Sequence, residues 1–140
     1  MKRTILILTI VFYASLTNAQ KSLHIYGGQD HEIYLGCLNC NDYDKSSIWN
    51  EYGDYGNSYK TNSIWNSYGK YGGSYSAESP FNAYAKYPPV IVDKDGKFYG
   101  YLTINEYHKD RAEFGLAMTI YKYYDMIRDN VSAWYKKIFE

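Results

Sequence analysis

The stretch SIWNEYGDYG, residues 47–56, recurs as SIWNSYGKYG at residues 63–72. A more divergent copy, SPFNAYAKYP, occupies residues 79–88, so the repeat period is 16 residues. Self-similarity at a fixed spacing indicates a repeated structural unit. The tyrosines in each copy have helical spacing, but the recurring glycines disfavour a stable helix. We therefore predict that each copy is a compact, turn-rich loop, with a very short solenoid of stacked turns as the alternative.

A longer duplication frames these repeats. Gly36, Leu38, Asn41, Tyr43 and Lys45 recur as Gly100, Leu102, Asn105, Tyr107 and Lys109, each 64 residues later and thus four repeat periods apart. Both flanks have the pattern of a hairpin. Residues 90–92 and 98–104 favour strands and are joined by an Asp-Gly turn signal, while residues 23–26 and 32–38 follow the same plan with a longer turn.

The C-terminal segment has a different pattern. Between residues 111 and 139 there is no proline and a single glycine. Apolar residues recur there at steps of three and four, which predicts an amphipathic helix: Leu116, Ile120, Tyr124, Ile127, Val131, Trp134 and Ile138. We expect this helix to pack on the same domain, over one face of the sheet. A homodimer seam and a membrane-surface helix are the alternatives.

These elements predict an α+β fold. Two duplicated hairpins form a small antiparallel sheet, the Tyr/Gly repeats make a turn-rich connection between them, and the amphipathic helix closes the domain. The predicted organisation is a signal peptide at 1–19, the hairpin and repeat domain at 20–110, and the helix at 111–140.

The N-terminus predicts export. Lys2 and Arg3 precede an apolar run at residues 5–16, and the short residues 17–19 precede a predicted cut after Ala19. No other stretch is apolar and long enough to span a membrane, so none is expected after signal removal. We expect the mature protein to be periplasmic, at the cell surface or extracellular.

Charge and composition narrow the class of partner. Loss of Lys2 and Arg3 leaves 13 basic residues against 15 acidic ones, a net charge of −2. Such a chain has no electrostatic basis for nucleic-acid binding. The chain has 19 tyrosines, which together with Gly, Asn and Ser suit either a surface that recognises polar targets or a thin core whose tyrosine hydroxyls reach solvent.

The aromatic turns are the candidate contact surface. The predicted ligand-binding residues, which would stack on sugar rings and donate hydrogen bonds, are Trp49, Tyr52, Tyr55, Trp65, Tyr68 and Tyr71. The competing interpretation is that Ile48-Trp49 and Ile64-Trp65 form the core of each repeat. The partner would be a glycan or an envelope protein.

Cys37 and Cys40 are the chain's only cysteines. In an exported protein a short disulfide is the favoured interpretation, with a metal site or a redox pair as alternatives. The histidines lack metal-ligand spacing, and no metal or other cofactor is predicted. Asp93-Lys94-Asp95-Gly96 resembles the opening of a calcium loop, but position 12 of that pattern is Ile104, so a hairpin turn is favoured.

One resemblance extends over about residues 32–110. The run YLGCLNCNDYD at 34–44, the Asn-x-Tyr-Gly-x-Tyr-Gly units and PPVIVDKDG at 88–96 resemble a set of exported bacterial proteins with tandem units of this kind. The resemblance implies an exported, bacterial, repeat-bearing protein and implies no site residue. The C-terminal helix lies outside it.

The sequence contains no nucleophile motif and no metalloprotease motif, and its paired carboxylates lie in polar turns. It therefore predicts a non-catalytic secreted or cell-envelope binding module. The alternative is a structural or secretion-accessory protein that self-assembles through the C-terminal helix.

Overall fold

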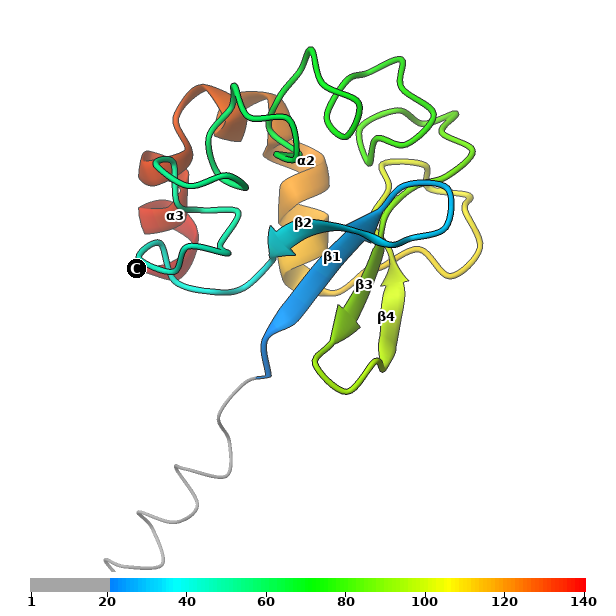
Figure 1. The fold of residues 1–140 in the computed structure, drawn as a ribbon, viewed down its shortest axis with the longest axis horizontal. Helices are drawn as coiled ribbons and strands as arrows, with labels where there is room; N and C mark the ends of the chain where they lie inside the picture. Colours follow the sequence, from blue (N-terminus) through cyan, green and yellow to red (C-terminus); the bar gives the residue numbers. More distant parts are fainter. Residues whose placement is uncertain (1–20) are drawn as a thin grey trace, which may run out of the picture.

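The computed structural model describes residues 21–140, so the predicted signal peptide lies outside the described residues. Four strands form one sheet: β1 (Leu23–Gly27), β2 (Ile33–Cys37), β3 (Val90–Asp93) and β4 (Phe98–Tyr101). Their order is β2-β1-β3-β4 and every neighbouring pair is antiparallel (Figure 1). The two hairpins are therefore joined by pairing between their first strands, β1 and β3. With two C-terminal helices, this confirms the predicted α+β class.

The duplication predicted from the 64-residue offset is visible in the backbone. Gly36 and Gly100 both adopt positive φ, 109° and 121°, a region that side chains other than glycine rarely enter. The pairing register shifts once in each hairpin. The last residue of the second strand, β2 or β4, also forms an isolated parallel bridge to a residue further along the chain. These bridges, Cys37 to Ser47 and Tyr101 to Arg111, are themselves 64 residues apart. The two flanks are therefore two copies of one structural unit.

The repeats between the hairpins form stacked turns. Trp49, Trp65 and Phe81, which hold the same position in the three copies, are all buried. Their ring centroids are 5.6 Å apart for the first pair and 6.0 Å for the second. Each indole Nε1 donates to a backbone carbonyl of an earlier turn, from Trp49 to Leu38 at 2.7 Å and from Trp65 to Ile48 at 2.6 Å. The arrangement is the short solenoid that the sequence left as an alternative.

Two helices follow the sheet, where the sequence predicted one beginning near residue 111. α2 (Gly115–Asp129) and α3 (Val131–Phe139) are separated by Asn130. Asn130 has non-helical φ and ψ of −157° and 78°, and its side chain accepts a hydrogen bond from the backbone N–H of Ala133 at 3.2 Å. The apolar periodicity continues across this residue, but its capping bond ends one helix and begins the next. Within residues 21–140, neither helix combines the length and apolar character that crossing a bilayer requires.

The helices pack against the repeat stack. Tyr124 of α2 stacks on Phe81 with centroids 4.3 Å apart, and the ring of Tyr135 in α3 lies edge-on to Trp49 at 6.3 Å. Ile120 and Ile127 of the predicted apolar stripe are fully buried in the same core. In Figure 1 both helices lie on the side of the molecule where the repeat turns gather. Part of the stripe considered for a homodimer seam is thus covered within the chain.

Burial raises the pKa of Tyr121, in α2, to about 12. Its hydroxyl donates to the Ala112 carbonyl at 2.7 Å, and the Arg111 guanidinium lies 4.2 Å from its ring centroid. Because this pKa exceeds the ordinary value of 10.0, the folded chain holds a proton that the unfolded chain releases between pH 10 and 12. We therefore expect the free energy of unfolding to fall by about 3 kcal/mol as pH rises through this window.

Urea unfolding at pH 8 and pH 11 measures about half of this decline, because pH 11 lies midway between the two pKa values. The Tyr121→Phe variant keeps the ring and lacks the titrating hydroxyl, so its alkaline decline should be smaller than that of the wild type. Equal declines in the two proteins would contradict the assignment to Tyr121.

Candidate ligand-binding surface

The structure divides the six predicted contact residues into two groups. Trp49 and Trp65 expose 0% of their surface and Tyr71 exposes 6%, so the prediction that these three form a contact surface is wrong. An indole ring buries a large apolar area, and in the two copies that contain tryptophan a backbone carbonyl accepts its N–H. By contrast, Tyr52 and Tyr68 are 89% and 98% exposed, and Tyr55 is partly exposed.

The exposed group is larger than the sequence predicted. Within residues 21–140, seven tyrosines are 87% exposed or more: Tyr43, Tyr52, Tyr59, Tyr68, Tyr75, Tyr84 and Tyr107. Six of them, five in the repeats and Tyr43 just before them in the first flank, fall into two series with the 16-residue period. One series is Tyr43, Tyr59 and Tyr75, and the other is Tyr52, Tyr68 and Tyr84. We call these six residues the tyrosine array. Because the copies stack, we expect each series to form a column along the outside of the stack.

A local hydrogen bond fixes the backbone of most of the exposed tyrosines. Six of the seven exposed tyrosines lie two residues after an asparagine whose Oδ1 accepts the tyrosine backbone N–H, at distances from 2.8 to 3.1 Å. This is an Asx-turn. Tyr75 is the exception, because Gly73 takes the place of the asparagine. The turn uses the backbone of the tyrosine and leaves the ring in solvent. The Asn-x-Tyr spacing was the sequence signal that could have identified every exposed tyrosine of this group except Tyr75.

Folding does not account for a tyrosine at these positions. A ring that exposes about nine-tenths of its area gains little from burial, and the Asx-turn needs only a backbone N–H. The residue between asparagine and tyrosine differs among the copies and is Asp42, Glu51, Ser58, Ser67, Ala83 or Glu106. The tyrosine does not vary. Within this one chain, the repeats have therefore diverged at the position before the tyrosine, which is partly buried in four of the six copies, and have kept the exposed tyrosine itself.

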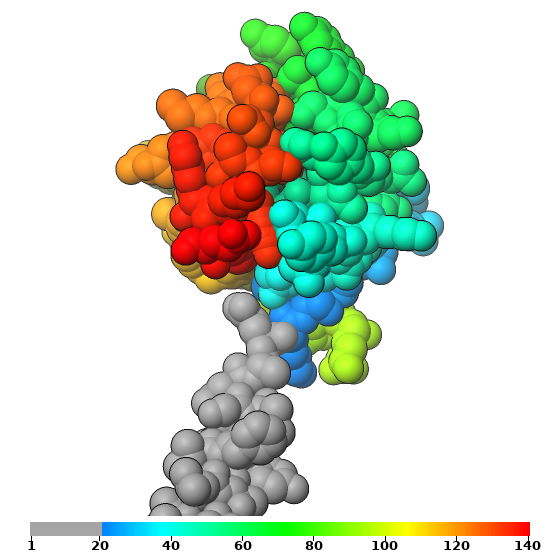
Figure 2. Space-filling view, turned by 90° about the vertical axis from the view of Figure 1, so that its left-hand side faces the viewer, coloured from blue at the N-terminus to red at the C-terminus, as the bar shows by residue number. Residues whose placement is uncertain are grey.

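Two adjoining hollows lie where the array meets the helices. Their volumes are about 370 Å³ and 250 Å³, and both are lined by Ser58, Tyr59, Arg128 and Asp129. Tyr68 and Ser67 complete the first hollow, and Tyr52, Glu51 and Val131 are among the residues that complete the second. In the space-filling view the helices, orange to red, meet the repeat turns, cyan to green, along a seam (Figure 2).

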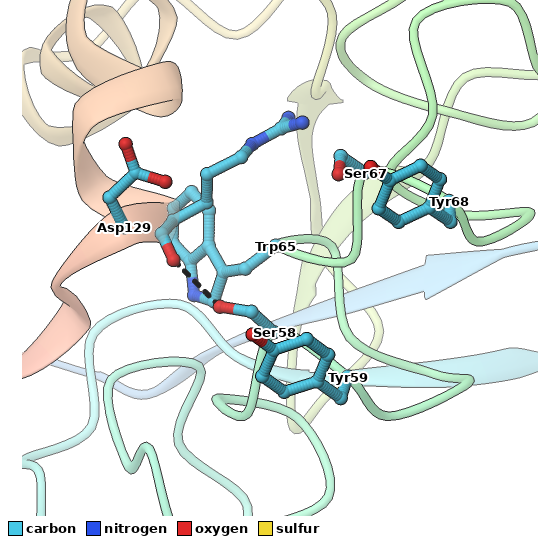
Figure 3. Close-up of a pocket in the computed structure, with 7 residues that line it drawn as sticks. Ser58, Tyr59, Trp65, Ser67, Tyr68 and Asp129 are labelled. Carbon is cyan, nitrogen blue, oxygen red and sulfur yellow. Dashed lines mark hydrogen bonds between the residues drawn. The ribbon is translucent and has the colours of Figure 1, made fainter.

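The first hollow presents several groups that can bind polar ligands. Figure 3 shows Asp129 on the helix side, with its carboxylate pointing away from Ser58 and Tyr59 of one turn, and Ser67 and Tyr68 of the next turn on the opposite side. The Ser58 hydroxyl donates to the Arg128 carbonyl at 2.7 Å, which fastens this turn to the end of α2. Trp65 lies beneath the floor of the hollow without exposed area.

A larger hollow of about 430 Å³, lined by Leu23, Phe114 and Ile138 among others, contains none of the exposed tyrosines.

Cys37 and Cys40 are joined by a disulfide with their Cα atoms 5.5 Å apart, at the end of β2. No group of three or more His, Cys, Asp or Glu side chains within residues 21–140 has a geometry that could hold a metal ion.

The Asp93 turn is a hairpin turn. One carboxylate oxygen of Asp93 accepts the backbone N–H groups of Asp95 and Lys97, at 2.9 and 3.0 Å. The other accepts the Tyr99 hydroxyl at 3.0 Å. The carboxylate is thus occupied in closing the turn between β3 and β4.

Comparisons of this chain with protein-family models, with curated proteins and with solved structures each found no match.

Proposed function

We propose that the mature chain is a non-catalytic, exported binding module that uses the tyrosine array to contact a glycan. The observation that carries the proposal is the invariance of the exposed tyrosines among repeats that vary beside them. Folding does not require a tyrosine at this position, yet every copy has one. A contact between these rings and a binding partner would explain why. The disulfide between Cys37 and Cys40 supports export, because such bonds persist in oxidising compartments.

The chemistry of the surface suits sugar rings. A tyrosine ring offers an apolar face for the C–H groups of a sugar and a hydroxyl for its polar edge, at a low cost in side-chain entropy. The repeats stack with core rings 5.6 and 6.0 Å apart, which is about the length of one sugar ring. Successive tyrosines of a column would therefore meet successive residues of an extended polysaccharide. The Ser and Asp side chains of the hollows add hydrogen-bonding groups beside the rings.

Self-assembly through the C-terminal helix has less support. Ile120, Ile127 and Val131 of the apolar stripe are buried against the chain's own core. Part of the face that would form the seam of a homodimer is therefore occupied in the monomer.

Retention on insoluble polysaccharides tests the proposal. We expect the chain of residues 20–140 to be retained on at least one matrix of an envelope or plant polysaccharide panel, and to be released by the matching free sugar. The variant Tyr52→Ala/Tyr59→Ala/Tyr68→Ala removes the rings that border the two hollows. Its retention should fall at least tenfold, a loss of about 1.4 kcal/mol or more of binding free energy.

Tyr107→Ala is the matched control. Tyr107 is 92% exposed and follows the same Asx-turn, but it lies in the second flank, outside the array. This variant should bind as the wild type does, and both variants should keep the wild-type far-UV spectrum and melting temperature. Undiminished retention of the triple variant would show that the array is not the contact surface. Absence of wild-type retention on every matrix would exclude a glycan of the panel and favour a protein partner.

A further inference from the structure

Arg128 at the end of α2 is buried without the hydrogen bonds that usually accompany burial. Its side chain is 10% exposed, and its Nε has no hydrogen-bond partner. One terminal nitrogen donates to the Gly72 carbonyl at 3.4 Å, near the limit for a hydrogen bond. Asp125, the acidic residue paired with it, lies 3.9 Å from Nε and is itself 80% exposed. A guanidinium carries five N–H donors, so this group is under-satisfied.

The second buried arginine of the fold shows the contrast. The Arg111 side chain is 7% exposed, and its Nε donates to the Thr103 carbonyl at 2.9 Å. Glu113 lies 3.8 Å from one of its terminal nitrogens. Burying a charge is costly unless it is paired and hydrogen-bonded. Arg111 meets that condition more fully than Arg128 does.

Aromatic rings hold Arg128 in place. Its guanidinium carbon lies 5.5 Å from the Phe81 ring centroid and 5.2 Å from that of Tyr124. These rings fix the position of the group through cation–π contact without using its in-plane N–H donors. Arg128 also lines both hollows beside the tyrosine array. A positioned, under-satisfied guanidinium at the wall of a hollow is suited to a planar anion that accepts two hydrogen bonds.

We infer that the seam between α2 and the repeats is a subsite for a carboxylate-bearing sugar, so that the glycan of the proposed function contains uronic acid residues. The inference rests on the proposed function. The carboxylate accepts from the terminal nitrogens of Arg128, whose single hydrogen bond within the described residues is the long one to the Gly72 carbonyl. The sugar ring contacts Tyr59, and the buried Nε stays unpaired in the complex. Asp129 also lines the hollows, but it is exposed, so water and salt screen its charge.

The inference can be tested with two polysaccharides that share one backbone and differ only in the charge of the carboxyl group. Polygalacturonate carries a carboxylate on each sugar, and the fully methyl-esterified polymer has the same backbone without the charge. We expect the chain of residues 20–140 to bind polygalacturonate at least tenfold more tightly than the ester. Arg128→Lys keeps the charge and loses the planar fork, so its affinity for polygalacturonate should fall at least tenfold, with little change for the ester.

Lys122→Met is the matched control for Arg128→Met. Both residues belong to α2 and both variants lower the net charge by one, but Lys122 is exposed and does not line either hollow. Lys122→Met should bind both polymers as the wild type does, whereas Arg128→Met should lose the preference for the acid. Should Arg128→Met fail to fold, Arg128→Lys with a wild-type melting temperature decides the question.

The outcomes separate the two proposals. Equal wild-type affinity for the acid and its ester, or unchanged binding of polygalacturonate by folded Arg128→Lys, overturns the subsite and leaves glycan binding intact. Absence of binding to every polysaccharide overturns both proposals.

Discussion

Replacing Trp65 by alanine should remove about 3–5 kcal/mol from the free energy of unfolding, the usual cost of deleting a fully buried large aromatic ring. Trp65 is the middle ring of the stack, between Trp49 and Phe81, and it exposes 0% of its surface. Its loss also leaves the Ile48 carbonyl without the indole donor, now at 2.6 Å. A domain of this size has only about 5–15 kcal/mol of stability, so the variant should be largely unfolded or melt far below the wild type.

Tyr68→Ala in the same copy is the control. Tyr68 is 98% exposed, and the fold uses only its backbone N–H, which donates to Asn66 at 3.1 Å. We expect its stability to stay within about 0.5 kcal/mol of wild type in urea titrations. Similar stability losses in the two variants would contradict the division of the repeat aromatics into core and surface.

Gly72→Ala should also be damaging, at a cost of about 3 kcal/mol, the upper end of the usual range for overpacking. A Cβ added at Gly72 would overlap the carbonyl oxygens of Ile64 and Asn66, which belong to the backbone of the same copy. Those oxygens cannot move aside as the end of a flexible side chain could, so the whole turn must shift. Urea titration of the variant measures the loss.

Gly115→Ala is the matched control for this substitution. Gly115 is the first residue of α2, and a Cβ placed on it meets nothing within 4 Å. Because alanine forms helices better than glycine, the variant should be neutral or up to about 1 kcal/mol more stable. A Gly72→Ala protein as stable as Gly115→Ala would show that the turn around residue 72 is looser than described.

The sequence predicted the parts of this fold that depend on local patterns. The 16-residue period and the 64-residue offset identified the equivalent positions, and the Asp-Gly signal placed the turn between β3 and β4. The break between α2 and α3 was missed, because apolar spacing continues across Asn130 and only the capping bond of that residue interrupts the helix.

The candidate site was harder to predict. Periodicity shows that Trp49 and Trp65 are equivalent, but it does not show whether equivalent rings point into a stack or out of it. That choice depends on acceptors such as the Ile48 carbonyl, which only the folded stack supplies. Arg128 could not be found at all, because its surroundings come from Gly72 and Ser58, residues 56 and 70 positions away in the chain.

The packing of the helices on the stack has a consequence for how such a chain can change. Tyr124 of α2 meets the third ring of the stack, Phe81, while Tyr135 and Phe139 of α3 meet the first, Trp49. The helix pair therefore covers the core rings of three repeat copies. Tandem repeats gain and lose copies readily by recombination, but the core ring of a fourth copy would have no helix to pack against. The helix pair thus limits the number of copies, and with it the length of the surface that the repeats present.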